Sequence, residues 1–182
     1  MPPGCAASSA FASSPRRAPL ATRIGIATGE VLVGNIGSTE RMNYTVMGDT
    51  ANLASRLEGL NKQYGTVLAI SETTFEQARP AIVARPIDVV AVKGKQRGVR
   101  VYELLAMAAD HDAGAEALAA DATAALDAYL ARRFDDAIAG WTRILDRHPG
   151  DRPATILRDR AIGFAASPPG PEWTGVTIAT EK

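Results

Sequence analysis

The sequence predicts an α+β unit followed by a small helical extension. Between residues 23 and 105, short β-rich runs alternate with helical segments, and the last two runs flank a turn rich in Gly and Lys. Strands interleaved with helices and closed by a hairpin are typical of an α+β domain. Beyond residue 105 the sequence becomes Ala-rich, and its apolar residues recur at helical spacing.

Each element of the α+β unit has a local signal. The expected strands are residues 23–27, 44–47, 67–70, 89–92 and 99–104, of which the last two form the hairpin. The expected helices are residues 49–60 and 71–77, the second with Ser71 at its N-cap. Residues 30–36 form an apolar run bounded by glycines, and periodicity alone does not assign it to helix or strand.

The helix over residues 49–60 carries two polar residues four positions apart, Asn52 and Arg56. With Asp49 or Thr50 as the expected cap, these side chains lie about 40° apart around the helix axis, away from the leucines that pack. A carboxamide beside a permanently charged guanidinium suits binding of ribose and phosphate oxygens. The alternative is an exposed polar pair, which is common on any amphipathic helix.

Four motifs occur in a fixed order: Arg23-Ile-Gly-Ile-Ala-Thr-Gly29, Val33-Gly-Asn-Ile-Gly37, Tyr44 to Glu58, and Val92-Lys-Gly-Lys95 before Val101-Tyr-Glu-Leu104. From Arg23 to Leu105 the chain resembles the C-terminal half of a class III adenylate/guanylate cyclase catalytic domain. The resemblance implies part of a ferredoxin-like domain, a mixed sheet with helices on one face. It also favours a short helix over residues 30–36. The glycines lack the spacing of a phosphate loop, which indicates packing or turn roles.

The same resemblance implies the site residues. Asn52 would orient the ribose and Arg56 would stabilise charge at the α-phosphate, while Lys93 would hold the terminal phosphates. This assignment requires the three side chains to face a common hollow. The alternatives are a surface or capping Asn52, an Arg56 paired with Glu58 or Glu40, and a Lys93 that only makes the hairpin tip polar.

The position that contacts the purine in the family is occupied by Thr45. A threonine hydroxyl can accept a hydrogen bond from the adenine amino group, which favours ATP. The alternative is a β-branched residue that suits a strand. For Asp49, a helix cap is the expected role and catalysis is the alternative.

The family's two metal-binding aspartates and its adenine-recognising lysine precede the Arg-Ile-Gly-Ile strand. Here there is no acidic residue before Glu30, so the ligands for Mg²⁺ or Mn²⁺ are absent from the chain. We therefore expect the chain to be inactive alone. Class III sites form between two subunits, and the resemblance implies that this chain could supply the ribose and phosphate residues to an intact partner.

Two functions follow. The first is an adenylate cyclase catalytic fragment that converts ATP to cyclic AMP and pyrophosphate as half of a shared site. The alternative is a non-enzymatic module that pairs with an intact cyclase, with the helical extension recruiting a partner.

The helical extension has the spacing of a tetratricopeptide helix pair, with Tyr129, Phe134 and Trp141 in the seam and Pro149 starting the next helix. One and a half units are too few to stand alone, so we expect the pair to pack on something else. The expected organisation is a disordered leader (1–22), the partial cyclase domain (23–105), a linker (106–119), the helical pair (120–166) and an irregular tail (167–182).

Composition limits the partners. Twenty basic and twenty acidic residues cancel, which argues against general attraction to nucleic acid. Cys5 is the single cysteine, as expected of a reducing compartment such as the cytoplasm, or its side of a membrane in a sensor-linked parent. No apolar run approaches the length that spans a bilayer.

Overall fold

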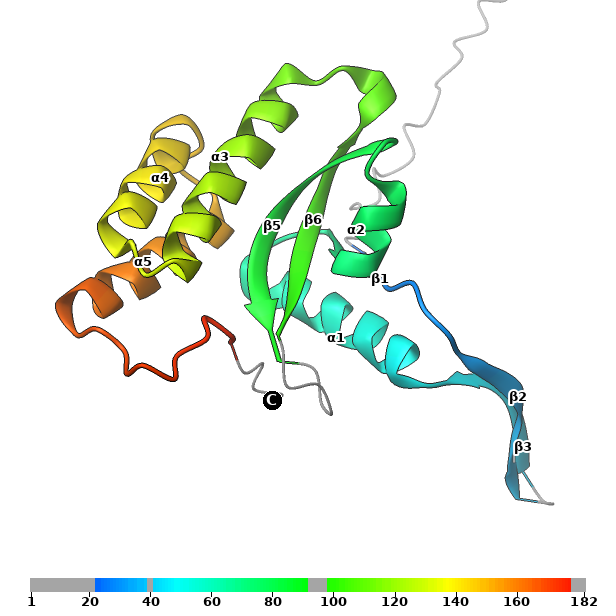
Figure 1. Cartoon of the computed structure of the whole chain (residues 1–182). Helices are drawn as coiled ribbons and strands as arrows, with labels where there is room; N and C mark the ends of the chain where they lie inside the picture. The colour runs from blue at the N-terminus through cyan, green and yellow to red at the C-terminus, as the bar shows by residue number, and fades with distance from the viewer. Residues whose placement is uncertain (1–21, 39–40, 92–97, 178–182) are drawn as a thin grey trace, which may run out of the picture.

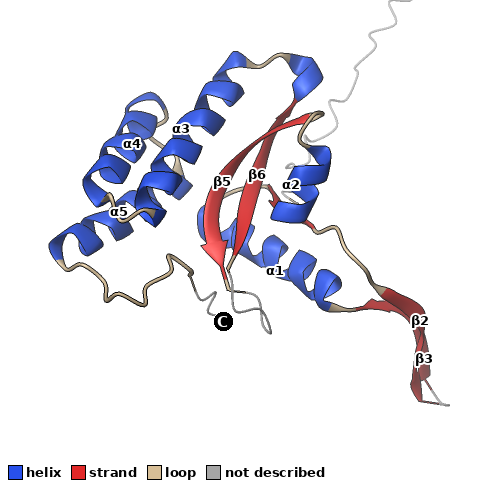
Figure 2. Ribbon diagram, in the orientation of Figure 1, coloured by secondary structure: helices blue, strands red, loops and turns tan. Residues whose placement is uncertain are grey.

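The computed structural model describes residues 22–38, 41–91 and 98–177. A four-stranded mixed sheet, two helices packed on it, a projecting two-stranded ribbon and a three-helix unit make up this part of the chain (Figures 1 and 2). The α+β class and the mixed sheet are confirmed. Lys93 and the hairpin turn around it lie outside the described residues.

The sheet has the order β1-β4-β6-β5. Strand β1 (Ile24–Ile26) runs parallel to β4 (Leu68–Ser71), which pairs antiparallel with β6 (Val99–Met107). Strand β5 (Ile82–Val90) closes the sheet as the antiparallel partner of β6, as the predicted hairpin requires. It begins seven residues earlier than expected, because it continues through Arg85, Pro86 and Asp88 across two register shifts.

The two helices of the α+β unit cover opposite faces of the sheet. Helix α1 (Asp49–Tyr64) packs Leu57, Leu60 and Tyr64 on strand residues that include Ala69 and Val101. Helix α2 (Glu72–Ala78), capped by Ser71 as predicted, stacks Phe75 on Tyr102 at 4.1 Å between ring centroids. Val101, which contacts α1, and Tyr102, which contacts α2, are consecutive residues of β6, and consecutive strand residues point to opposite faces of the sheet. The expectation of helices on one face is therefore wrong for this sheet.

Residues 30–36 do not form the expected helix. Strand β2 (Leu32–Ser38) pairs antiparallel with β3 (Arg41–Met47) over seven residue pairs. Periodicity alone does not assign this apolar run to helix or strand, and its hydrogen-bonded pairing with β3 makes it a strand. Gly37 has a φ of 151°, and a Cβ there would come within 1.9 Å of the Arg41 carbonyl oxygen, so the end of this ribbon requires glycine.

Three helices follow the sheet: α3 (Ala113–Leu130), α4 (Phe134–Arg147) and α5 (Arg152–Ala166). Helix α3 begins inside the expected linker, after a 3₁₀ turn at Ala108–Asp110. Tyr129, Phe134 and Trp141 meet in one core, as predicted. Pro149 does not start α5, because Asp151 caps that helix by accepting a hydrogen bond from the Ala154 amide. The tetratricopeptide assignment itself stays a prediction.

Candidate functional site

Strand β1 lies very close to α1. A Cβ on Gly25 would come within 2.2 Å of the Ala54 carbonyl oxygen, and one on Gly29 within 2.5 Å of the Thr50 hydroxyl. The buried Asn61 amide donates to the Ile24 carbonyl at 2.9 Å and accepts from Thr66 at 2.6 Å. Packing thus explains these two motif glycines, as the sequence indicates, and it fixes the helix that carries Asn52 and Arg56.

The start of α1 differs from the expectation. Gly48, with a φ of 137°, is the N-cap residue, and no side chain caps the helix. Asp49 is the first helical residue, where its negative charge is favourable at the positive end of the helix dipole. The Thr50 hydroxyl donates to the Glu30 carbonyl instead. The capping role expected for Asp49 or Thr50 is therefore wrong.

Asn52 and Arg56 lie one turn apart on α1, as predicted. Asn52 is exposed and Arg56 is half-buried, whereas Leu57, Leu60, Asn61 and Tyr64 form the buried face. Gly59 and Gln63 continue the same side of the helix and are exposed, and nothing lies within 4 Å of where a Gly59 Cβ would stand. On this side of α1, Asn52, Gly59 and Gln63 are therefore exposed, whereas Arg56 is partly covered.

Thr45 lies on β3, in the ribbon that leads into α1. It is exposed and pairs with Gly34, whose missing side chain leaves open space beside the threonine. Lys93 is outside the described residues, so the structure does not place it. The expected common hollow of Asn52, Arg56 and Lys93 stays a prediction.

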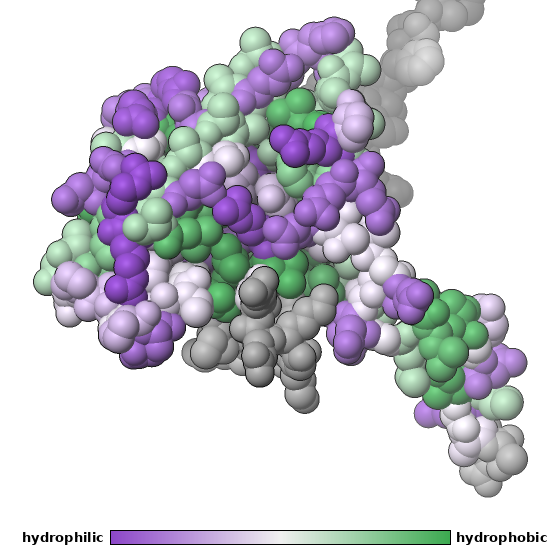
Figure 3. Space-filling model, in the orientation of Figure 1, coloured by the Kyte–Doolittle hydropathy of each residue, from purple (hydrophilic) through white to green (hydrophobic). Residues whose placement is uncertain are grey.

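The ribbon exposes apolar side chains. Leu32 is 66%, Met42 63% and Tyr44 76% exposed, and Figure 3 shows apolar surface gathered on the projecting strands. Residues directly opposite in an antiparallel pair share a face. By this register Met42, Tyr44 and Val46 lie on one face of the ribbon and Thr45 on the other.

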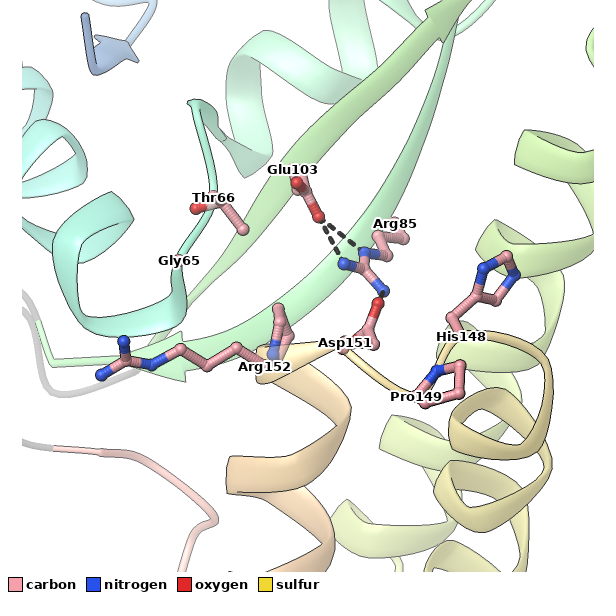
Figure 4. A pocket seen from close by; sticks show the side chains of 10 residues that line it. Gly65, Thr66, Arg85, Glu103, His148, Pro149, Asp151 and Arg152 are labelled. Carbon is pink, nitrogen blue, oxygen red and sulfur yellow. Dashed lines mark hydrogen bonds and ion pairs between the residues drawn. The ribbon is translucent and has the colours of Figure 1, made fainter. Parts of the chain in front are cut away.

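Two cavities lie elsewhere on the molecule. One, of about 340 Å³, is lined by Arg85, Glu103, His148 and Asp151 among others (Figure 4), and the second, of about 310 Å³, by Arg100 and Leu130 among others. Neither cavity is lined by Thr45, Asn52 or Arg56. The candidate residues therefore lie outside both of these cavities.

The divalent cation implied by the resemblance needs carboxylate ligands. No group of three His, Cys, Asp or Glu side chains able to hold a metal ion occurs within residues 22–38, 41–91 and 98–177. The donor set of this part of the chain does not fit the ion. In the same ranges, no helix is long and apolar enough to cross a bilayer.

Sequence reasoning missed Arg85 and Asp88, which are 5% and 0% exposed on β5. Arg85 pairs with Glu103 and Asp151, while Asp88 accepts hydrogen bonds from Tyr64 and Arg160. An Arg and an Asp inside the run Ile-Val-Ala-Arg-Pro-Ile-Asp-Val-Val were the available signal, because charged residues are rarely buried unless paired.

Part of the chain is similar in sequence to known proteins. The family model for the adenylate and guanylate cyclase catalytic domain matches residues 6–106, more than half of the chain. Adenylate cyclase 1 of Rhizobium meliloti is 44% identical over 84 residues, which cover 46% of this chain and 13% of that protein. The terminal-differentiation-specific adenylate cyclase of Dictyostelium discoideum is 32% identical over 145 residues, which cover 78% of this chain and 7% of that protein.

Among solved structures, the adenylyl cyclase CyaB from P. aeruginosa is 38% identical, with a TM-score of 0.39 over 46% of this chain and 41% of that chain. The chain thus spans only a small part of the two curated relatives named above. The matched residues include Asn52 and Arg56 and the strands of the described sheet, apart from the last residue of β6. The chain belongs to the adenylate and guanylate cyclase catalytic domain family.

Proposed function

We propose that this chain contributes one half of an adenylate cyclase site that is completed by a second cyclase subunit. The reaction is the conversion of ATP to 3′,5′-cyclic AMP and pyrophosphate. The ribose 3′-oxygen forms a bond to the α-phosphorus, the bond from that phosphorus to the β-phosphate oxygen breaks, and the hydroxyl proton is released. Positioning and charge neutralisation account for most of such catalysis.

The observation that carries this proposal is that Asn52 and Arg56 share a side of α1 outside its buried face. They project one turn apart, next to a ribbon whose apolar side chains are exposed. A contiguous exposed apolar patch marks an interaction site. We infer that a second cyclase subunit covers the ribbon and faces α1, so that the hollow between the subunits holds the nucleotide.

In this site the carboxamide of Asn52 would orient the ribose, and the guanidinium of Arg56 would stabilise charge at the α-phosphate. Lys93 would hold the terminal phosphates as a point charge. Thr45, beside the open space at Gly34, would accept a hydrogen bond from the adenine amino group. Carboxylates for a divalent cation would come from the second subunit.

The test is a complementation assay. The full chain is mixed with an intact class III adenylate cyclase whose own asparagine and arginine at the matching positions are replaced by alanine, with ATP and Mn²⁺. We expect cyclic AMP only in the mixture. Cyclic AMP from this chain alone, or none from a mixture in which the two chains associate, would contradict a shared site.

The alternative function is a non-enzymatic module that pairs with an intact cyclase. The exposed ribbon supports it, since such a module needs only a surface that pairs with the cyclase. The same mixture separates the two functions when association is measured by analytical ultracentrifugation. Association that leaves the alanine-substituted cyclase inactive supports the module.

A further inference from the structure

Helix α5 of the extension is tied to the cyclase sheet at its first turn. Its N-cap residue Asp151 accepts a hydrogen bond from Arg85 on β5, and the same guanidinium pairs with Glu103 on β6 at 2.7 Å (Figure 4). The side chains of Arg85 and Asp151 are 6% and 7% exposed. These contacts hold the start of α5 in a fixed position relative to β5 and β6.

A second contact lies about two and a half turns further along the helix. Arg160 of α5 donates through Nη1 to both carboxylate oxygens of Asp88, at 3.1 and 3.2 Å, and to the Thr177 hydroxyl at 2.7 Å. The Tyr64 hydroxyl donates to the same carboxylate from the last turn of α1. Helices α1 and α5, strand β5 and the C-terminal segment therefore meet at one buried aspartate.

Between these two contacts, α5 packs directly on the end of α1. Ile156 joins the apolar cluster that includes Leu57, Leu60 and Tyr64. The methylene groups of Arg152 lie over Gly65, the residue that ends α1 in a left-handed conformation at φ 73°. The last turns of α1 are thus held from outside the cyclase domain.

The held end belongs to the helix that carries Asn52 and Arg56. Arg56 lies two turns before Tyr64, about 12 Å along the same helix axis. A helix transmits a displacement of one end to the other because its backbone hydrogen bonds keep it rigid. A displacement of about 1 Å at a catalytic group can lower a rate by about a hundredfold.

The ion pair between Arg160 and Asp88 is better suited to fixing the position of α5 relative to β5 and α1 than to stabilising the fold. Desolvation of two charges offsets much of their attraction, so a buried pair contributes little net free energy of folding. Its directional hydrogen bonds nevertheless define how the groups that share it are placed. Burial, and then the charge of Asp88, raise the pKa of Tyr64 above its ordinary value, so its hydroxyl stays a donor at neutral pH.

We propose that Arg160 is a positioning residue of the cyclase site: through Asp88 and Tyr64 it fixes the end of α1, so the helical extension sets the placement of Asn52 and Arg56. This inference rests on the proposed function. It gives the extension a role in activity without a ligand of its own.

The first test measures the coupling without nucleotide. Amide hydrogen exchange is followed in the full chain carrying Arg160→Gln, with Arg158→Gln as the matched control, because Arg158 pairs with Asp159 on the same helix at the surface. We expect exchange in residues 57–64 to rise about tenfold in Arg160→Gln while α4 is unchanged. Unchanged exchange in residues 57–64, or an equal rise in all elements, would overturn the coupling.

The second test measures the effect on the reaction in the complementation assay. Arg160→Gln should lower kcat about tenfold with little change in the KM for ATP, and Arg160→Lys should recover part of the loss. A kcat equal to that of the unaltered chain, despite faster exchange in α1, would overturn the positioning role. If no mixture makes cyclic AMP, the proposed function fails, whereas the exchange result still decides the coupling.

A third variant covers the case in which Arg160→Gln does not fold. Thr177→Val removes only one acceptor of Arg160 and leaves Asp88 paired. The same exchange and kcat criteria apply to it, with a smaller expected change of about threefold because one neutral hydrogen bond is lost.

Discussion

Gly25 of β1 lies against the backbone of α1 at Ala54, so close that a Cβ on Gly25 would come within 2.2 Å of the Ala54 carbonyl oxygen and 2.5 Å of the Glu58 amide nitrogen. Both contacts are with backbone atoms, which cannot rotate away as a side chain would. The glycine of the Arg-Ile-Gly-Ile motif therefore sets the distance between the sheet and the helix that carries Asn52 and Arg56.

Gly25→Ala should lower the free energy of unfolding by about 1–3 kcal/mol, because α1 must move off the sheet to admit the methyl group. Gly34→Ala is the matched control, since nothing lies within 4 Å of its Cβ position. We expect the control to change stability by about 0.5 kcal/mol or less. Urea unfolding followed by circular dichroism measures both, and equal stability of the two variants would contradict the close packing.

Gly59→Ala should have opposite effects on stability and on activity. Gly59 lies inside α1 on the side of Asn52 and meets no neighbour in the described chain. Alanine in a helix interior is favoured over glycine by about 0.5–1 kcal/mol, so the variant should be more stable. If the nucleotide or second subunit approaches this side closely, the methyl group should lower complementing activity. A more stable variant with full activity would show that nothing packs there.

Arg56→Lys should lower kcat in the complementation assay by about a hundredfold, with a smaller change in the KM for ATP. Lysine keeps the charge but loses the planar fork of donors that matches phosphate oxygens. Lys62→Ala, in the last turn of the same helix, is the control and should leave kcat unaltered. Steady-state kinetics of cyclic AMP formation decide this, and full activity of Arg56→Lys would remove the arginine from the site.

Replacing Met42 and Tyr44 by Ser should weaken association with the second subunit while leaving the fold intact. Both side chains are largely exposed on one face of the ribbon, so their loss should change the free energy of unfolding by about 0.5 kcal/mol or less. Burial of two such side chains at an interface should be worth more than tenfold in Kd. Sedimentation velocity measures the Kd. Val67→Ser, 63% exposed away from the ribbon, is the control and should not alter it.

Stability should fall at alkaline pH because of Tyr64. Burial, and then Asp88, raise the pKa of Tyr64 above 10.0 in the folded chain. The unfolded chain therefore loses this proton first. The stabilisation is complete below about pH 10 and is lost as the pH rises through the folded-state pKa, by up to about 1.4 kcal/mol per pH unit. Urea unfolding at pH 8 and pH 11 should show a smaller pH dependence in Tyr64→Phe than in Tyr44→Phe, the exposed control.

Local signals predicted the regular elements of the cyclase part well. Ser71 caps α2 because a serine before a helix accepts the hydrogen bond of the Thr74 amide, which is a property of adjacent residues. The i,i+4 spacing of Asn52 and Arg56 likewise determines that they share a side of α1. The helix expected at residues 30–36 was wrong, because the structure of this apolar run depends on pairing with β3 rather than on its own periodicity.

The cap of α1 and the helix arrangement on the sheet were also beyond local signals. Asp49 has a side chain suited to capping, yet the chain turns at Gly48 and the aspartate enters the first turn. Phe75 stacks on Tyr102 on the face of the sheet opposite to Leu57, and which face a helix covers depends on the assembled sheet rather than on the helix sequence.

By itself the sequence determined the family and the order of most strands and helices, because these follow from motifs and spacings within a few positions. The nucleotide-binding roles of Thr45, Asn52, Arg56 and Lys93 stay predictions from the same motifs. The tertiary structure alone decided what α1 rests on. Asp88 and Arg160 are 72 residues apart in the chain, and no local pattern pairs a buried carboxylate with one guanidinium among many. That pairing exists because β5 and α5 pack together, which buries the Asp88 carboxylate fully and the Arg160 guanidinium partly, so that the buried carboxylate requires the guanidinium.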